Sequence, residues 1–542
     1  MKRTLSTAVA TVRPTCTTAQ STPANTRHSV RNTLVLAAAA LLFATANAQT
    51  ANPNIQTVNS NAQSVNAKGL YDNLPFAMNR VAEPDIPIYN ICITDFGGVP
   101  DGKTPNTLSF AKAIKHLEER GGGRLNVPFG VWLTGPIELK SRIELHLEDG
   151  ALVLFSPDRA DYPLVESTFE GVKSRRCMSP LTANGATDVA ITGNGVFNGS
   201  GESWRPVKRS KLTPGQWAKL CEGGALNKAQ NVWYPTAGIR DISNDNRLIA
   251  EAFGKGDDAS WNRIHDYLRP ALLSFTDCKR VLLEGATFEN SPGWNLHPLM
   301  CEDLTLRNVT IRNPWFAQNG DGLDLESCRN VVVCGCSLDV GDDAICIKSG
   351  RDKEGRDRNK PTENVIIDGC RVYHGHGGFV IGSEMSGGAR NILLRKCLFI
   401  GTDAGLRFKS TRGRGGTVSD IYIEDIGMSG IKGDAVTFNL YYGGANAGNN
   451  TAEKVEADET TPSFRDITIK NVVCKGAKQA AYFNGLPEMP IRNITVSNSV
   501  FESESGFTLN HIHGLTLDNV QIDNAKGETI VRQNGVEGFK RR

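Results

Sequence analysis

The chain has 542 residues, of which 39% are hydrophobic and 7% aromatic, with 55 glycines and a formal net charge of +2. This near-neutral balance excludes a generally basic protein of the kind that binds nucleic acid through its phosphates. The hydrophobic share is enough for a core, and the length alone allows more than one domain.

Residues 1–48 have the pattern of a signal peptide. Arg27 and Arg31 precede an apolar run, Leu34 to Ala46, and small residues suit cleavage after Ala48. The run is too short to span a membrane. Because the segment holds five Lys or Arg and no acid, its removal leaves a net charge of −3. The sequence therefore predicts a secreted or periplasmic protein with no membrane span and no nucleic acid partner.

Residues 49–88, which are rich in Asn, Ala and Gln, predict a flexible lead-in. The next segment, about 89–135, combines a helix with strands. Its helical spacing is carried by Phe110, Ala113, Ile114 and Leu117. Three glycines from Gly121 then end the helix. We expect this short α/β segment to cap the open end of a solenoid.

A short strand-like segment recurs through the second half of the chain. Each copy has about four β-rich residues and ends in turn-forming residues. The copies begin at Arg280, Asp303, Asn330, Asn364, Asn391, Asp420, Asp466, Asn493 and Gly514. Their spacing is mostly 21 to 34 residues, with one gap of 46, which is typical of a solenoid. We predict an all-β fold, a right-handed parallel β-helix, as a single domain over residues 89–542.

Residues 201–266 interrupt this rhythm and carry four tryptophans. We interpret them as an insertion on one face, where insertions often build a binding cleft.

The chain has 13 cysteines, and Cys334-x-Cys336 does not have zinc-site spacing. Small buried hydrophobic residues are a better interpretation of most of them than disulfides.

Four polar motifs occur at nearly the same phase of the repeat. They are Asn319-Gly320-Asp321, Gly341-Asp342-Asp343, Gly375-His376-Gly377 and Arg407-Phe408-Lys409. Since stacked strands lie about 4.8 Å apart, the motifs should form one column. Three carboxylates this close repel one another, which raises the pKa of at least one and leaves a protonated acid near neutral pH. Glycoside hydrolysis needs such an acid beside a carboxylate. We interpret Asp324 as a turn or ladder residue.

The remaining motif residues suit the same chemistry. His376 lies one rung past Asp343, which favours a role in setting acid protonation, although His374 fits the same position. Arg407 and Lys409 are two residues apart on a strand and therefore share a face. Beside an acid cluster, these two cations suit recognition of a carboxylate.

With these motifs in this order, the chain resembles the polygalacturonase family of pectin-degrading enzymes, glycoside hydrolase family 28. The resemblance runs from about Asp95 to Tyr442 and more loosely beyond. Gly320 and Phe408 depart from the residues that the family has at these places. The resemblance implies a β-helix, inverting hydrolysis of α-1,4-galacturonosyl linkages, and no metal or other cofactor. The implied partner is an acidic plant polysaccharide, namely pectin or galacturonan oligomers.

The resemblance also implies catalytic roles. Asp342 is the general acid, Asp321 and Asp343 are the bases that activate water, and His376 tunes the acid.

The implied substrate-binding residues are the first motif's Asn319, the two cations Arg407 and Lys409, and a tyrosine about one rung later. Tyr442 fits that position, and the adjacent Tyr441 does too.

Several alternatives stay open. Within the family, the chain could hydrolyse rhamnogalacturonan or xylogalacturonan. A calcium-dependent pectate lyase would use the acid cluster as its metal site, and a non-catalytic β-helix would only bind glycan. The insertion at 201–266 would wall off one end of a cleft, which favours exo action on polygalacturonate. We expect a monomer.

Overall fold

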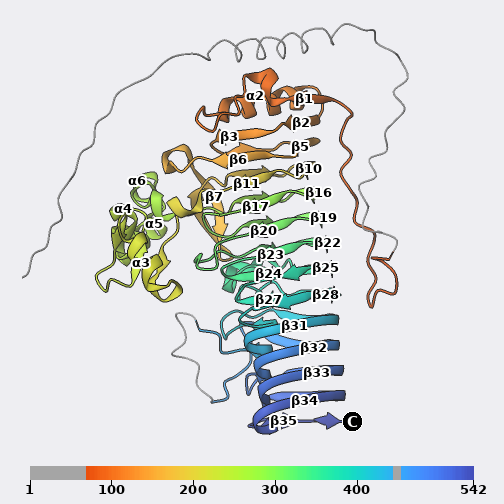
Figure 1. Ribbon diagram of the computed structural model, residues 1–542. Coiled ribbons are helices and arrows are strands. Elements are labelled where there is room, and N and C mark those ends of the chain that lie inside the picture. The colour runs from red at the N-terminus through yellow and green to blue at the C-terminus, as the bar shows by residue number, and fades with distance from the viewer. Residues whose placement is uncertain (1–68, 444–452) are drawn as a thin grey trace, which may run out of the picture. The chain divides into compact units, whose positions relative to one another are not determined.

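The computed structural model describes residues 69–443 and 453–542, so the predicted signal peptide and residues 49–68 lie outside the described chain. Within the unit that holds the described residues, parallel strands stack rung upon rung into a coil that runs from helix α2 to strand β35 (Figure 1). The strands join in one 31-stranded sheet whose neighbouring strands pair in parallel. The predicted right-handed parallel β-helix is confirmed.

The coil has three faces, and most rungs give one short strand to each. The first face holds β1 (Asn90–Cys92), β2 (Gly123–Val127), β5 (Ile143–Leu147), β10 (Thr187–Gly193), β16 (Lys279–Glu284), β19 (Glu302–Arg307), β22 (Arg329–Cys334), β25 (Thr362–Asp368) and β28 (Ala389–Arg395). The second face holds β3 (Gly130–Thr134), β6 (Ala151–Phe155), β11 (Val196–Asn198), β17 (Thr287–Glu289), β20 (Thr310–Arg312), β23 (Ser337–Asp339), β26 (Arg371–Val372) and β29 (Leu398–Ile400).

The third face carries the polar motifs. It holds β4 (Ile137–Glu138), β9 (Leu181–Asn184), β15 (Leu273–Thr276), β18 (Leu296–Leu299), β21 (Leu323–Glu326), β24 (Asp343–Lys348), β27 (Gly377–Ile381) and β30 (Leu406–Lys409). The last rungs are long curved strands, namely β31 (Thr417–Asn439), β32 (Ser463–Asn484), β33 (Ile491–Asn510) and β34 (Ile512–Arg532). Two short strands, β35 (Val536–Glu537) and β36 (Lys540–Arg541), follow them.

The residues that begin the sequence repeats adopt left-handed backbone conformations. At Asn330, Asn364 and Asn391 the φ angles are 56°, 57° and 55°, a region that Asn tolerates better than most residues. Their side chains form a ladder, in which Nδ2 of Asn364 donates to Asn330 over 3.2 Å and Nδ2 of Asn391 donates to Asn364 over 3.0 Å. Each copy of the sequence repeat therefore begins at a bend of the backbone within one rung.

Aliphatic and aromatic side chains fill the interior. Phe408 stacks on Phe438 with ring centroids 4.1 Å apart, and Phe438 stacks on Phe483 at 5.0 Å. The cysteines among the described residues are all free, and all but Cys92 and Cys221 are buried. For these buried cysteines, the interpretation as small hydrophobic residues is confirmed.

The N-terminal end of the coil is covered by α2 (Thr107–Glu119), which follows the 3-10 helix η1 (Ile93–Phe96). The four residues that predicted the helix, Phe110, Ala113, Ile114 and Leu117, are the four that it buries. They join the coil's main hydrophobic core.

Residues 69–88 pack on the coil, in contrast to the flexible lead-in predicted over 49–88. Leu70 is buried against Val332 and Ile366. Nη2 of Arg395 donates to the backbone oxygens of Gly69 and Leu70, each over 3.0 Å. The composition of this segment could not reveal the contact, because the contact depends on one apolar side chain and on two backbone carbonyl groups, which every residue has.

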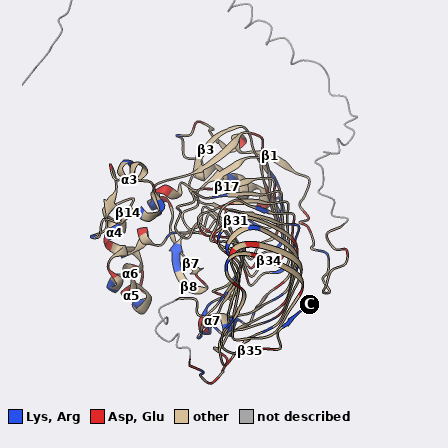
Figure 2. Ribbon diagram, turned by 60° about the horizontal axis from the view of Figure 1, so that its bottom comes forward, with Lys and Arg blue, Asp and Glu red and all other residues tan. Residues whose placement is uncertain are grey.

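The insertion forms a helical lobe beside the coil (Figure 1). It contains η3 (Gly201–Ser203), β12 (Val207–Lys208), η4 (Arg209–Lys211), α3 (Pro214–Leu220), β13 (Ala225–Leu226), β14 (Val232–Tyr234), α4 (Ala237–Ser243), α5 (Asn246–Lys255), α6 (Asp258–Arg263) and η5 (His265–Tyr267). Trp204 and Trp261 of the insertion share a small hydrophobic core with Tyr162 and Cys177 at the base of the hairpin described below. Lys and Arg are interspersed with Asp and Glu on this lobe as on the coil (Figure 2).

An antiparallel hairpin, β7 (Leu164–Phe169) and β8 (Val172–Cys177), leaves the coil after η2 (Arg159–Asp161). Its tip reaches helix α7 (Asp352–Arg358), where the amide of Lys173 donates to Glu354 over 3.0 Å. Nη1 of Arg351, next to this helix, lies 3.3 Å from Oε2 of Glu170. The hairpin therefore bridges rungs that are distant in sequence. No helix in the described ranges is long and apolar enough to span a membrane.

Candidate active site

The third face brings the four predicted motifs into one column. Strands β21, β24, β27 and β30 pair in that order, with Asp343 opposite Gly377 and Val380 opposite Arg407. Asp321 and Asp342 stand in the turns just before β21 and β24, and His376 just before β27. The spacing of the motifs along the sequence is therefore the length of successive rungs.

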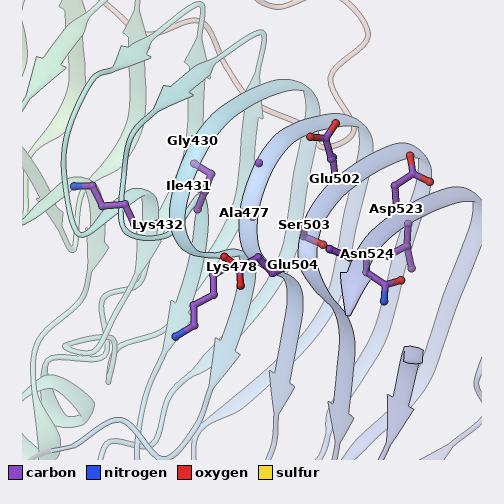
Figure 3. A pocket seen from close by; sticks show the side chains of 13 residues that line it. Gly430, Ile431, Lys432, Ala477, Lys478, Glu502, Ser503, Glu504, Asp523 and Asn524 are labelled. Atoms are coloured by element: carbon purple, nitrogen blue, oxygen red, sulfur yellow. The ribbon is translucent and has the colours of Figure 1, made fainter. Parts of the chain in front are cut away.

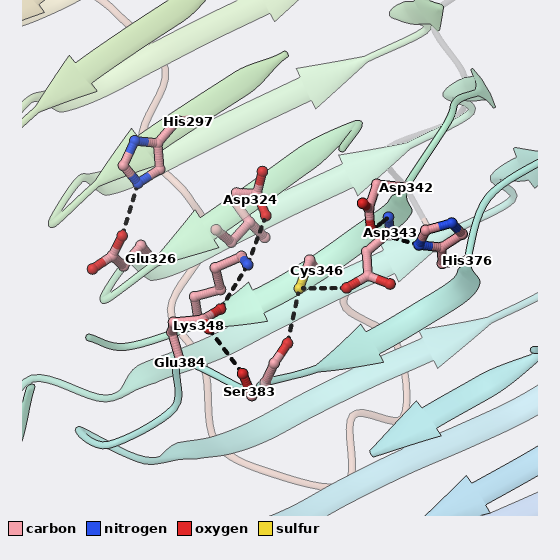
Figure 4. A network of polar contacts seen from close by, with 12 residues as sticks. His297, Asp324, Glu326, Asp342, Asp343, Cys346, Lys348, His376, Ser383 and Glu384 are labelled. Carbon is pink, nitrogen blue, oxygen red and sulfur yellow. Dashed lines mark hydrogen bonds and ion pairs between the residues drawn. The ribbon is translucent and has the colours of Figure 1, made fainter. Parts of the chain in front are cut away.

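Hydrogen bonds tie the acids to the histidine and the cations. Nδ1 of His376 lies 2.8 Å from Oδ1 of Asp342, which also accepts from the amide of Asp343 over 3.0 Å. Arg407 donates to Oδ1 of Asp343 over 3.2 Å, and Lys409 donates to its Oδ2 over 2.6 Å. Figure 4 shows the two adjacent acids and the histidine at one end of a longer polar network. When Asp342 is ionised, this contact places the proton of His376 on Nδ1, because a carboxylate only accepts.

Opposite pKa shifts separate two of the three carboxylates. Burial, together with the charges of Asp324 and Asp342, raises the pKa of Asp321 well above its usual range. Burial also acts to raise the pKa of Asp343, but the charges of Lys409 and its neighbouring cations outweigh burial and lower it. The cluster thus holds a carboxyl that favours its proton next to one that is kept ionised, as the sequence predicts. The carboxyl with the raised pKa is Asp321, which the family resemblance had implied as a base.

Asp324 is not the turn or ladder residue that we predicted. It lies on β21 with 0% of its surface exposed, and Nζ of Lys348 lies 3.5 Å from its Oδ1. The same ammonium group donates to Glu384 over 2.9 Å and lies 4.4 Å from the ring centroid of Trp294. Burial raises the pKa of Asp324 to about 7, and the nearby positive charge limits the rise. Loops and the hairpin cover this part of the strand, which the sequence pattern could not show.

We expect the raised pKa of Asp324 to make stability fall with rising pH. Between about pH 4 and 7 the folded state retains a proton that the unfolded state has released, so the free energy of unfolding decreases across this interval. Asp324→Asn removes the titration and should flatten the dependence of the melting temperature on pH. Glu118→Gln, at an exposed carboxyl on α2, is the control. Equal slopes for wild type and Asp324→Asn would contradict this account.

A metal ion is disfavoured at the cluster. Ligand atoms of Asp342, Asp343 and His376 lie within 4.8 Å of one another, which is close enough to hold an ion. However, Arg407 and Lys409 already occupy both oxygens of Asp343. Two fixed positive charges repel a divalent cation, whereas they attract an anionic substrate.

Two pockets meet at the histidine, and His376 and Asp403 line both. We call the first the arginine lobe; it has a volume of about 450 Å³ and is lined by Arg407, Lys409 and Tyr442 among others. We call the second the lysine lobe; it also measures about 450 Å³ and is lined by Lys211, Trp315 and Lys432 among others. Together they form a cleft beside the acid cluster, reached through His376, Arg407 and Lys409, which contact Asp342 and Asp343.

The arginine lobe distinguishes between the two candidate tyrosines. Nζ of Lys409 lies 4.8 Å and Cζ of Arg407 5.5 Å from the ring centroid of Tyr442. Tyr441 instead packs on the core beside Arg412. Asn319 lines neither lobe; its Oδ1 accepts from Arg269 over 3.0 Å.

Sequence reasoning missed three residues of the cleft. Nζ of Lys211 lies 3.4 Å from Nε2 of His376, and Oδ2 of Asp403 lies 3.9 Å from it. Trp315 lines the lysine lobe with 44% of its surface exposed. Lys211 belongs to the insertion, 165 residues before the histidine, so no repeat phase connects the two.

A further pocket of about 1000 Å³ lies on the turns of the long strands β31 to β34 (Figure 3). It shares Lys432 with the lysine lobe, but its lining mixes cations with Glu502, Glu504 and Asp523 and contains neither His376 nor the two cations that bind Asp343. It is therefore a surface furrow apart from the chemistry.

Comparison with known proteins agrees with this geometry. The sequence profile of glycosyl hydrolases family 28 matches residues 255–517. A probable polygalacturonase of Vitis vinifera is 29% identical over 420 residues, which cover 76% of this chain and 74% of the relative. An exo-poly-alpha-D-galacturonosidase of Dickeya chrysanthemi is 28% identical over 399 residues, covering 70% and 61%. The structure of a hyperthermoactive exopolygalacturonase from Thermotoga maritima superimposes with a TM-score of 0.69 at 34% identity, over 83% of this chain and 95% of the other. The chain belongs to glycoside hydrolase family 28.

Proposed function

We propose that the chain hydrolyses α-1,4-galacturonosyl linkages of polygalacturonate from one end of the polymer, with inversion at the anomeric carbon. The observation that carries the proposal is the pairing of Arg407 and Lys409 with an ionised Asp343 in a lobe that also opens to the histidine. This arrangement places cations for a sugar carboxylate directly beside acid and base groups. It is also in keeping with the polygalacturonase relatives.

Exposure supports the roles of the carboxylates. The side chain of Asp342 is 23% exposed, whereas that of Asp343 is 2% exposed and Asp321 is 3% exposed. Asp342 is therefore the carboxyl that can reach the glycosidic oxygen and donate a proton to it. The ionised Asp343 suits the base that activates water. Asp321 belongs to the same cluster, where the charge of Asp342 adds to burial in raising the pKa of Asp321.

Exo action follows from the covered floor of the cleft. Outward side chains of the third face form this floor, yet His297 on β18, one rung before Asp321, is 4% exposed, and Lys348 at the end of β24 is 3% exposed. The hairpin contributes to the cover, since Phe169 stacks on Trp294 with ring centroids 5.4 Å apart. Toward the C-terminus the floor opens into the arginine lobe. A polymer can therefore extend in one direction only.

Product analysis on polygalacturonate tests the proposal. We expect monomeric galacturonate as the only early product, because a cleft closed at one end admits only a chain end. A substrate labelled at its reducing end should keep the label on the shortened polymer. A ladder of oligomers would mean that the cleft is open at both ends. Unsaturated product ends lost on adding a chelator would instead identify a calcium-dependent lyase.

We propose that the protein is exported from the cell. The basic residues and apolar run within residues 1–48 favour export to the periplasm or the medium, where an acidic plant polysaccharide would be met. Detection of the protein in culture medium or a periplasmic extract tests it.

A further inference from the structure

We propose that the lysine lobe binds the terminal galacturonate residue of the substrate and that Lys211, supplied by the insertion, recognises its carboxylate. This inference rests on the proposed function. The lobe measures about 450 Å³, within the range of small-ligand sites. Because it shares His376 and Asp403 with the arginine lobe, one substrate can occupy both lobes with the bond to be cleaved between them.

The position of the lobe identifies the sugar residue that it holds. Gly341, which precedes Asp342, lines the lysine lobe, while residues of the later strands β30 to β32 line the arginine lobe. Trp315 and Val340 of the earlier rungs and Lys211 of the insertion line the lysine lobe as well, although Lys432 of β31 also reaches it. Most of the lysine lobe thus lies on the N-terminal side of the cleft, toward the covered rungs. The carboxylate cluster directs water at the anomeric carbon of this residue, so the residue is the glycone and the end is the non-reducing one.

The charges of the lobe leave a place for a carboxylate. Lys432 is paired with Asp403, with Nζ and Oδ1 3.5 Å apart. Lys211 has no carboxylate within 4.0 Å among the described residues, and its polar contact is Nε2 of His376 at 3.4 Å. A substrate carboxylate would supply the missing counter-charge through a charge-assisted hydrogen bond.

An aromatic ring completes the lobe. Trp315 is 44% exposed, although a tryptophan usually buries most of its surface in a folded protein. Its ring offers an apolar surface to the face of a sugar, and such a contact does not depend on the sugar's charge. The lobe therefore combines a contact that reads the carboxylate with one that does not.

Two trisaccharides separate these contributions. One is trigalacturonate, and the other has galactose in place of the non-reducing galacturonate, so only the terminal carboxylate differs. We expect Lys211→Gln to lower kcat/KM about tenfold on trigalacturonate and to leave the galactose-terminated substrate within about twofold. Lys432→Gln should act in the same sense but more weakly. Trp315→Ala should lower kcat/KM on both substrates by a similar factor.

Lys208→Gln is the matched control, because Lys208 is an exposed cation three residues from Lys211 that does not line the lobe. It should change neither substrate. Equal losses on both substrates for Lys211→Gln would overturn the proposal and assign Lys211 to positioning His376. No loss on either would overturn it as well. Failure of the wild type to release a monosaccharide from either trisaccharide would instead reject the proposed exo hydrolysis.

Discussion

Asp342→Asn should lower kcat on polygalacturonate by about 10²- to 10⁴-fold with little change in melting temperature, because an amide cannot give a proton to the leaving oxygen. The substitution keeps the size of the side chain and the acceptor oxygen that faces His376. Initial rates of reducing-end formation measure the effect. Asp149→Asn, at an exposed carboxyl between β5 and β6, is the matched control and should retain activity. Turnover near the wild-type value would remove Asp342 from the role of acid.

The stereochemistry of the product tests the same assignment independently. NMR of freshly formed product should show the anomer opposite to the substrate linkage. Retention would require two carboxyl groups about 5 Å apart acting as acid and nucleophile, rather than the separation of about 6.5–9.5 Å that leaves room for water.

The second large effect is expected at the cations. Arg407→Ala should lower kcat/KM on polygalacturonate about 10- to 100-fold, since a charge-assisted hydrogen bond contributes roughly 1.5–3 kcal/mol and about 1.4 kcal/mol corresponds to a factor of ten. On methyl-esterified pectin, which has no charge at that group, the wild type should be slower and the variant should lose less. Added salt should weaken the wild type more than the variant, because screening removes the same attraction.

The contact between Arg407 and Asp343 determines the pH at which the variant and the wild type should be compared. Because Arg407 helps to keep Asp343 ionised, the rates are best compared near neutral pH, where the remaining contact with Lys409 still favours the charged form. Arg371→Ala, at an exposed cation on the second face, is the control and should change neither substrate. Equal losses on charged and esterified substrate would show that Arg407 serves the acid cluster and not substrate recognition.

The coil was predictable from the sequence because its bends repeat. Residues such as Asn330 and Asn364 mark the bends of successive rungs. The four polar motifs occupy equivalent positions in their rungs and therefore form one column on the third face. Asp324 was misinterpreted because its burial depends on a cover from other parts of the chain. Lys211 was missed because its contact with His376 joins an irregular insertion to the coil, and no periodicity links the two.

Strand β30 shows which contacts the alternation of side chains predicts and which it does not. Alternation along β30 predicted that the two cations share a face, and the phenylalanine between them fills the interior against Phe438. The family's usual residue at that position is smaller, and the stack of aromatic rings accommodates the change. Local periodicity thus located the cations, whereas their partners at Asp343 became visible only in three dimensions.

The covered end of the cleft also affects how substrate enters and how product leaves. With a single entrance, a released monosaccharide must leave through the opening that the remaining polymer occupies. We therefore expect the shortened chain to withdraw before it can be cut again, which makes each cleavage a separate encounter. Exchange of product for substrate would then limit turnover at saturation, and accumulated galacturonate would compete with fresh chain ends for the same space.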